Sequence, residues 1–528
     1  MNPVVSSAEK DVEFKSGSNP HDVSANLHNV DLRIQEVADE LTDRQAHLGI
    51  DQELTPEELE TERAFVRKVD WQLMPLLLIT YGVQYADKIS LSSGVAFDLR
   101  RNTGLVGNDF AWLSTGFYLA YLIFEFPFAW LMQRYPLDKV LAIAVVGWGV
   151  CVLCLAACTD FVQLMAVRTL LGILESPINP GFLIIITAWY KREEQSIRSI
   201  AFFAMNSFFS LFILMMNYGV GKAAVGSSIA SWKAINLFLG ALSFFWGLIL
   251  FWRLCTPKNA SWLSAEEKAY AHARLVRNKT GESTSGIAIN WSQVWEAARD
   301  PQVYFLMFYT FFGMAASGGF STFSTIILQS FGLDVEQTIS YQLPWYAFQF
   351  VGCCIMGYVV NRYPNRNLNI TLAATFLVPP IVGIFLEGLL PNTKKWGRLI
   401  GFWITGTYTP AFFVMWCQTS HNVAGRTKKS TVQALTFTCW CLGFVVGPQT
   451  FQAKDAPQYR PGLYFCCACF VVAELTLIAW LIWVRWENKR RDKRSAAMGI
   501  TPDQAALEGC LFGLQDMTDK QVGVKDVF

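Results

Sequence analysis

Six charged side chains interrupt the long apolar stretches of this 528-residue chain, and they are the first candidates for chemistry. A charge near the centre of a bilayer costs at least ~2.5 kcal/mol, so each must face a protein interior or an aqueous cavity and have a partner. We therefore expect functional residues among them. The six are Asp87, Lys88, Glu125, Arg168, Glu175 and Glu474.

Four polar or small residues share one helix face in the apolar stretch 161–189. Arg168, Gly172, Glu175 and Asn179 follow one another at alternating helical spacings, which places them on one face at 3.6 residues per turn. The other faces are apolar. The pattern predicts a polar stripe in which Glu175 lies ~10 Å below Arg168.

Lys88 and Arg168 lie at similar distances from the outer ends of their stretches. This placement predicts that the two cations bind an anion together. The Arg guanidinium can form two parallel hydrogen bonds with a carboxylate, and the Lys ammonium contributes a point charge. Glu175 is the candidate proton carrier, because a carboxyl group in a dry cavity can be protonated near neutral pH unless a cation holds it ionised. Asp87 would set the charge state of Lys88. Alternatively, Arg168 with Glu175, or Asp87 with Lys88, forms a pair that neutralises itself and ties helices together.

Uncharged polar residues within the apolar stretches have two interpretations. They line the same cavity as Asn179, or they form hydrogen bonds between helices worth roughly 1 kcal/mol. These residues are Asn206, Gln349, Gln418 and Gln433.

A short repeat marks the predicted inner ends of two helices. Arg134 lies in the sequence Gln-Arg-Tyr-Pro at 133–136, and Arg362 lies in Asn-Arg-Tyr-Pro at 361–364, 228 residues later. We expect both arginines at a cytosolic gate, where Glu125 would pair with basic residues. The repeat predicts two related halves of six helices each.

Composition predicts the elements that position these residues. The chain has a net charge of +1, 52% hydrophobic and only 16% charged residues, which excludes a disordered or nucleic-acid-binding protein. Apolar runs of about 20 residues predict an all-α membrane protein with twelve transmembrane helices, and their length excludes β-barrel strands. The expected helices are 72–96, 110–131, 139–158, 161–189, 198–220, 232–253, 302–328, 338–360, 369–388, 398–418, 430–450 and 462–484.

Charge divides the chain into five parts. We expect a disordered N-terminal tail at 1–70, a six-helix bundle at 71–254, a cytosolic linker at 255–300, a second bundle at 301–486 and a C-terminal tail at 487–528. Lys and Arg flanking the helix ends favour a cytosolic location for both termini and the linker.

Enzyme signatures are absent from the sequence. It contains no GxSxG, HExxH or GxxxxGK[ST] motif. The sequence therefore lacks the residues that these hydrolases, zinc proteases and ATP-driven pumps use. Most cysteines lie in apolar runs without His or acidic partners, which favours packing over a metal site. The sequence therefore predicts no catalytic residue, metal or cofactor.

Five segments in order resemble the fungal allantoate permease family, in the anion:cation symporter branch of the major facilitator superfamily. These are RTLLGILESPINPG (168–181), WYKREEQSIR (189–198), PKNASWLSAEEKAYAHARL (257–275), HNVAGRTKKSTVQAL (421–435) and GPQTFQAKDAPQY (447–459). The resemblance implies a major-facilitator fold with a substrate site between two six-helix halves.

The resemblance also implies a function. It is proton-coupled transport of a small organic anion, such as allantoate, a vitamin-like acid or another carboxylate, at the cell surface. Related vesicular carriers use an Arg and a Glu seven residues later for anion binding and proton linkage, which match Arg168 and Glu175. The pair Asp87-Lys88 matches the family's Asp-Arg, and Lys loses the guanidinium fork. Residues 302–328 carry no charge, so a second substrate carboxylate is not supported there.

We therefore predict a secondary transporter, functional as a monomer in the plasma membrane, which moves a small organic anion with protons by alternating access. Lys88, Arg168, Asn179, Asn206, Gln349 and Gln418 would bind the substrate. Glu175 and Asp87 would couple protons. A proton-driven exporter of a metabolite or drug and a transporter-like nutrient receptor are the alternatives.

Overall fold

The protein is helical throughout the part of the chain that the structure describes. The computed structural model describes residues 56–277, 290–363, 368–391, 393–421, 423 and 425–497, and within these ranges it contains no strand. Residues 1–68 and 69–528 form two separate units, and the second unit holds the candidate residues.

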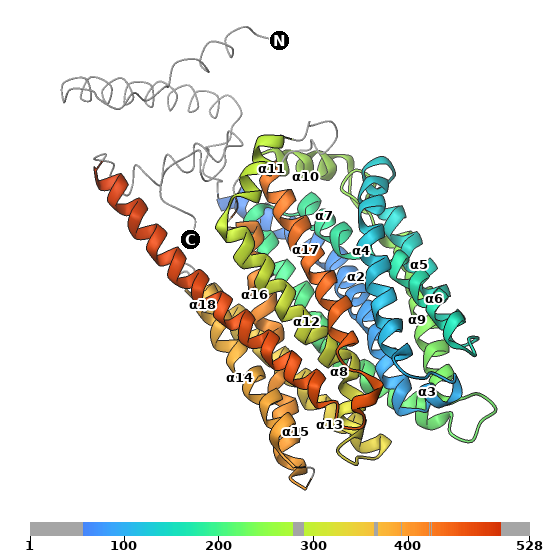
Figure 1. The fold of residues 1–528 in the computed structure, drawn as a ribbon. Helices are drawn as coiled ribbons and strands as arrows, with labels where there is room; N and C mark the ends of the chain where they lie inside the picture. The colour runs from blue at the N-terminus through green and yellow to red at the C-terminus, as the bar shows by residue number, and fades with distance from the viewer. Residues whose placement is uncertain are drawn as a thin grey trace, which may run out of the picture. The chain divides into compact units, whose positions relative to one another are not determined.

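Figure 1 labels the helices. They are α2 (Pro56–Ala96), α3 (Leu99–Asn102), α4 (Asp109–Arg134), α5 (Leu137–Leu155), α6 (Phe161–Glu175), α7 (Ile178–Trp189), α8 (Arg192–Ala223), α9 (Ser231–Arg253), α10 (Ala265–Arg277), α11 (Trp291–Ala298), α12 (Pro301–Gln329), α13 (Val335–Arg362), α14 (Asn369–Leu389), α15 (Lys395–Thr405), α16 (Tyr408–His421), α17 (Arg426–Gln449) and α18 (Arg460–Ala497).

Nine membrane spans are long and apolar enough to cross a bilayer, counted over the described residues and with α6 and α7 taken as one. This confirms an all-α protein with many spans. The predicted number of twelve would also require α2, α8 and the α15–α16 pair to cross the membrane, and it stays a prediction.

Two expected helices, 161–189 and 398–418, are each broken in the middle. The first break follows Glu175 because Pro177 has no backbone N–H and cannot continue the hydrogen-bond ladder. The second break contains Gly406, where a Cβ atom would lie 2.5 Å from the carbonyl oxygen of Trp345 in α13. Pro177 therefore accounts for the first break, and Gly406 permits the close approach of α13 at the second.

The two breaks occupy equivalent places in the internal repeat. Gly406 follows Ser176 by 230 residues, and Arg398 follows Arg168 by the same number. This offset differs by only two residues from that of the repeated Arg-Tyr-Pro sequence. The structure thus extends the repeat from one short motif to a pair of broken helices.

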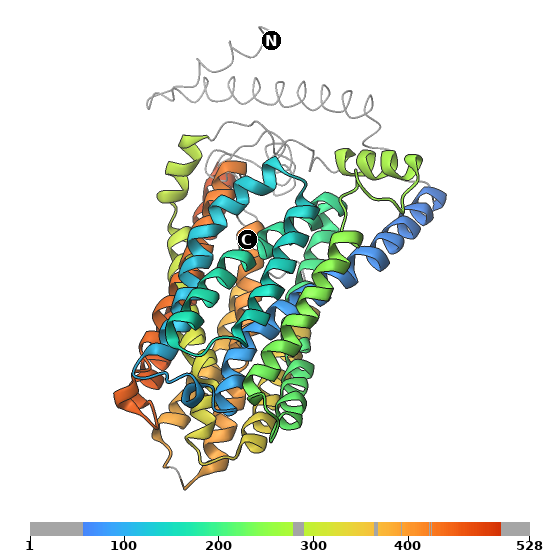
Figure 2. The same ribbon diagram turned by 90° about the vertical axis from the view of Figure 1, so that its right-hand side faces the viewer.

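Helices pack in two groups before and after the segment that holds α10 and α11. In the first group α5 packs on α9 and α4 on α6, and in the second α12 packs on α17 and α18 and α14 on α15 and α18 (Figure 2). Gly172 permits the close approach of α6 to α4, because a Cβ there would lie 2.3 Å from the Phe117 carbonyl oxygen. Contacts between the groups run mainly through α4 with α17 and α8 with α13. The domain boundaries expected from charge stay predictions.

Candidate functional site

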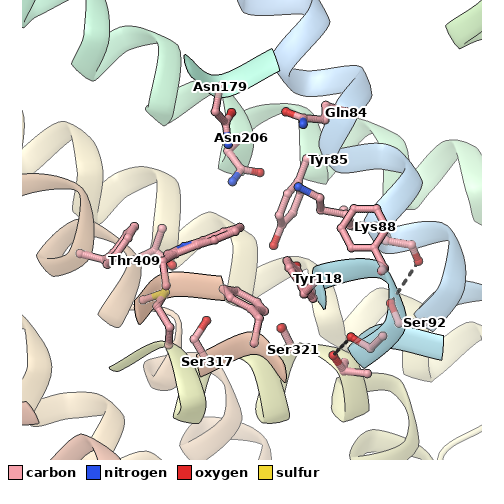
Figure 3. A pocket seen from close by; sticks show the side chains of 18 of the residues that line it. Gln84, Tyr85, Lys88, Ser92, Tyr118, Asn179, Asn206, Ser317, Ser321 and Thr409 are labelled. Atoms are coloured by element: carbon pink, nitrogen blue, oxygen red, sulfur yellow. Dashed lines mark hydrogen bonds between the residues drawn. The ribbon is translucent and has the colours of Figure 1, made fainter. Parts of the chain in front are cut away.

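A cavity of about 150 Å³ lies between helices of the two groups. Residues of α2, α4, α6, α7 and α8 line it from one group, and residues of α12, α13, α16 and α17 line it from the other. Figure 3 shows its polar side chains from close by. Five of the predicted substrate-binding residues line this cavity: Lys88, Arg168, Asn179, Asn206 and Gln349.

Lys88 pairs with Glu175. The ammonium nitrogen lies 3.6 Å from a carboxylate oxygen of Glu175, whose side chain has no exposed surface, whereas that of Lys88 is 19% exposed. The Lys88 ammonium also lies 5.8 Å from the centre of the Phe117 ring and 5.9 Å from that of Tyr121. Such distances allow cation–π attraction. Lys88 is therefore held by a buried acid and two aromatic faces of α4.

Arg168 is buried beside the same acid. Its side chain is 5% exposed, and the guanidinium interacts electrostatically with Asp87 and Glu175. Its Nε atom has no hydrogen-bond partner among the described residues. A buried donor without a partner is costly, so this guanidinium retains capacity to bind a ligand.

Asp87 turns away from Lys88. One carboxylate oxygen accepts hydrogen bonds from the indole N–H of Trp148 and from the Ser243 hydroxyl, at 3.4 Å from the latter. Adjacent residues of a helix point about 100° apart, which explains why Asp87 faces α5 and α9 while Lys88 lines the cavity. Of the two alternative pairs considered above, Asp87 with Lys88 is not formed, and Lys88 takes the direct contact with Glu175.

Side-chain amides surround the cavity with unused hydrogen-bonding atoms. Asn179 donates to the Tyr121 hydroxyl at 3.1 Å, and Gln349 accepts from Ser207 at 3.3 Å. The Oδ1 atoms of Asn179 and Asn206 and the Nε2 atom of Gln349 are buried without a partner among the described residues. Buried polar atoms are normally paired. These atoms therefore offer both acceptors and donors to a ligand.

Several lining residues were missed in the sequence. Gln84 faces Glu175 from the turn before Lys88, and its spacing of four from Lys88 was a usable signal. The aromatic lining residues gave no such signal, because an aromatic side chain in an apolar helix can face lipid as well as a cavity. Among them are Tyr85, Tyr118, Trp416, Phe437, Trp440 and Phe444.

The other predicted site residues lie apart from the cavity or outside the described part. Glu125 is half-buried in α4, and its Oε2 has no hydrogen-bond partner among the described residues. The exposed Arg134 lies over Trp130 at 5.8 Å, and Arg362 is exposed as well. The side chain of Gln418 falls outside the described residues. The gating roles stay predictions.

Glu387 and Arg398 are charged residues that the sequence interpretation omitted. Both are buried, at 1% and 2% exposure, where α14 packs on α15. They interact electrostatically, and the Arg398 guanidinium lies 4.0 Å from the centre of the Phe331 ring. Their positions near helix ends gave no sign of burial. Neither residue lines the cavity.

Long apolar helices around a buried cavity with aromatic walls and a few polar groups are typical of a membrane transporter. The sequence model described as "Major Facilitator Superfamily" matches residues 77–448. The chain belongs to this superfamily, and it is a multi-pass membrane protein of the transporter class.

Relatives extend over most of the chain. Allantoate permease of Saccharomyces cerevisiae is 32% identical, with 88% of this chain and 86% of that protein covered. An uncharacterized transporter of Schizosaccharomyces pombe is also 32% identical, over 81% of this chain and 79% of its own length. A crystal structure of a bacterial homolog to the human lysosomal transporter Spinster, in an inward-facing and occupied conformation, has a TM-score of 0.56 and 16% identity, with 78% of this chain and 96% of that chain covered. This last likeness shows the fold alone.

Proposed function

We propose that the protein takes up a small organic anion together with protons, by alternating access. The observation that carries the proposal is that two cations, Lys88 and Arg168, line one cavity, and that the buried carboxyl group of Glu175 interacts with both from outside its lining. Among the described residues no acidic side chain lines the cavity, since Asp87 and Glu175 both lie outside its lining, so the charge that a ligand would meet there is positive. A monoanionic substrate would balance it.

The contact between Lys88 and Glu175 supplies the coupling step. When a substrate carboxylate binds Lys88 and Arg168, Glu175 loses part of the attraction that holds it ionised, and proton uptake restores neutrality. Anion and proton then cross together. When the substrate leaves, Lys88 again favours the ionised form of Glu175, and the proton is released.

The cavity wall suggests the rest of the substrate. Amides of Gln84, Asn179, Asn206 and Gln349 could exchange hydrogen bonds with an amide or urea group, and the aromatic side chains of α17 would cover an apolar part. A carboxylate that carries a ureide or amide group fits both features. The similarity to allantoate permease supports this class of substrate.

The same proposal includes the membrane arrangement. It has twelve spans in two bundles, at 71–254 and 301–486, with both termini and the 255–300 linker in the cytosol and the protein in the plasma membrane as a monomer. Its support is the distribution of Lys and Arg along the chain.

Uptake measurements on Arg168 variants test the proposal. Cells that lack their own permeases would express the protein and be assayed at several pH values with labelled monocarboxylates and ureides. We expect a substrate among them, and we expect Arg168→Lys to reduce its uptake strongly because the guanidinium fork is lost. The matched control is Arg398→Lys, a buried arginine at the equivalent place of the repeat and off the cavity.

Surface expression must be equal in both variants. Unchanged uptake by Arg168→Lys and Arg168→Ala would overturn the assignment of this residue. A similar loss in the Arg398 control at equal expression would mean that Arg168 acts through helix packing.

A further inference from the structure

Helix α11 in the linker has two contrasting faces. Trp291 and Trp295, four residues apart, are 68% and 65% exposed and lie on one side of the helix. Gln293 and Ala297 on the other side are 3% and 0% exposed. Two tryptophans on one side of a short helix are far more apolar surface than a solvated linker needs.

The buried face of α11 is fixed to the start of α17. The side-chain oxygen of Gln293 accepts hydrogen bonds from the backbone N–H groups of Thr427 and Lys428, at 2.9 and 3.2 Å. The fully buried Lys428 ammonium pairs with Glu296 at 3.0 Å and with Asp300 at 2.8 Å. A buried cation with two carboxylates is a specific contact, because losing either side leaves an unpaired charge. The tryptophan face of α11 therefore has a defined direction.

The exposed face is continuous with the surface of the spans. Asp300 caps α12, which begins at Pro301, and the Tyr304 hydroxyl in its first turn donates to the Ala298 carbonyl at the end of α11. Tyr304 is itself 47% exposed on a predicted span. Only two residues separate α11 from that span, so its tryptophans lie close along the chain to the end of the span.

Other exposed tryptophans mark the same level. Trp252 is in the last turn of α9, Trp130 is near the end of α4, and Trp486 lies on α18 where its basic extension begins. By chain direction these helix ends lie on the linker side, with α10 and α11 (Figures 1 and 2). Tryptophan is enriched where spans meet the headgroup layer, because its ring is amphipathic.

We propose that α11 is an interfacial helix, which inserts Trp291 and Trp295 among the headgroups and upper acyl chains of the leaflet on the linker side. The Lys428 contact then links the start of α17 to the membrane surface through α11. Since α17 carries Phe437 and Trp440 of the cavity wall, lipid would act on a helix that lines the site. The partner is the bilayer surface, recognised by insertion of aromatic rings.

Photo-crosslinking tests this placement. The full chain would carry p-benzoylphenylalanine in place of Trp291 or Trp295, in separate variants, within nanodiscs of phosphatidylcholine and phosphatidylserine. We expect lipid adducts at both positions after irradiation, detected by mass spectrometry of the α11 peptide. The control replaces Glu266, an exposed residue in the first turn of the polar helix α10, and should give adducts at background level.

Both α11 positions must be tested in protein that elutes as a single species. Adduct yields equal to that of the Glu266 control would overturn the proposal, as would crosslinks from α11 to a second copy of the chain in place of lipid. Adducts in discs of phosphatidylcholine alone would still support it, because ring insertion does not require a charged headgroup.

Discussion

Among the residues that the structure describes, Glu175 is the carboxyl group that interacts with both cations of the cavity. It has no exposed surface, it lies 3.6 Å from the Lys88 ammonium, and it interacts electrostatically with Arg168. One carboxylate oxygen of Asp87, the other acid nearby, accepts hydrogen bonds from Trp148 and Ser243 on the side away from the cavity. The sequence proposed both Asp87 and Glu175 as proton-coupling residues. Their contacts differ, and the contacts of Glu175 with the two cations favour it as the residue that exchanges the proton.

Replacement of this acid by its neutral isostere should separate transport from coupling. Glu175→Gln resembles the protonated form permanently, so we expect loss of concentrative uptake and of its pH dependence, while exchange of labelled for unlabelled substrate continues. Uptake and exchange in proteoliposomes, each measured over a range of pH, check this. Glu474→Gln, a half-buried carboxyl group of α18 off the cavity, is the matched control and should retain pH-dependent uptake. Retention of coupling by Glu175→Gln would assign the proton to another group.

Among the elements, α17 connects three parts of the molecule. Its first turn holds Lys428 against α11, its middle lines the cavity, and it packs on α4 of the other group. The tight contact with α12 depends on Gly443 and Gly447, where a Cβ would lie within 2.8 Å of the α12 backbone. No pattern in the sequence indicated the buried lysine.

Removal of the Lys428 ammonium should destabilise this end of the protein severely. Lys428→Met removes a fully buried ammonium that pairs with Glu296 and Asp300, and removing one partner of a buried ion pair typically costs about 3–5 kcal/mol. We expect a clear fall in Tm of the purified protein, measured by intrinsic fluorescence. Lys222→Met is the control, because Lys222 pairs with Glu336 on an exposed surface, where an ion pair contributes little. Equal Tm values for the two variants would contradict a stabilising role of the buried cluster.

Helical periodicity placed Arg168 and Asn179 on one face, and both line the cavity although they lie in separate helices, α6 and α7. It missed the break itself, although Pro177 was a signal, and it interpreted Gly172 as part of the stripe although its role is contact with Phe117. Ion-pair partners could not be predicted. Lys88 meets Glu175, 87 positions away along the chain, rather than its neighbour Asp87, and a contact between such distant parts of the chain leaves no local pattern in the sequence.

The two groups of helices are joined most closely at the end away from the linker. Ser114 and Thr322 share a hydrogen bond at 3.3 Å, and Gln449 donates to Thr115 at 2.8 Å. Phe110 of α4 meets Phe323 of α12 edge to face, with ring centres 5.4 Å apart. These contacts close the cavity towards that side, which is the outer side if the linker is cytosolic. Alternating access requires that they separate in each cycle.

A reversible lock across these contacts should therefore stop transport. In Ser114→Cys/Thr322→Cys, oxidation with copper phenanthroline would join α4 to α12, and we expect uptake to fall to the level of cells without the protein and to return after reduction. Ser324→Cys/Gln342→Cys is the matched control, because this pair is also hydrogen-bonded, at 2.8 Å, but joins α12 to α13 within the second group of helices. Oxidation should leave uptake by this double variant unchanged. It should also leave uptake unchanged in the single-cysteine variants, which reveal any contribution of the native cysteines. Mass spectrometry must show the engineered disulfide in both pairs. Undiminished uptake by the first double variant with its disulfide formed would mean that α4 and α12 stay together throughout the cycle, and that the cavity opens outward elsewhere.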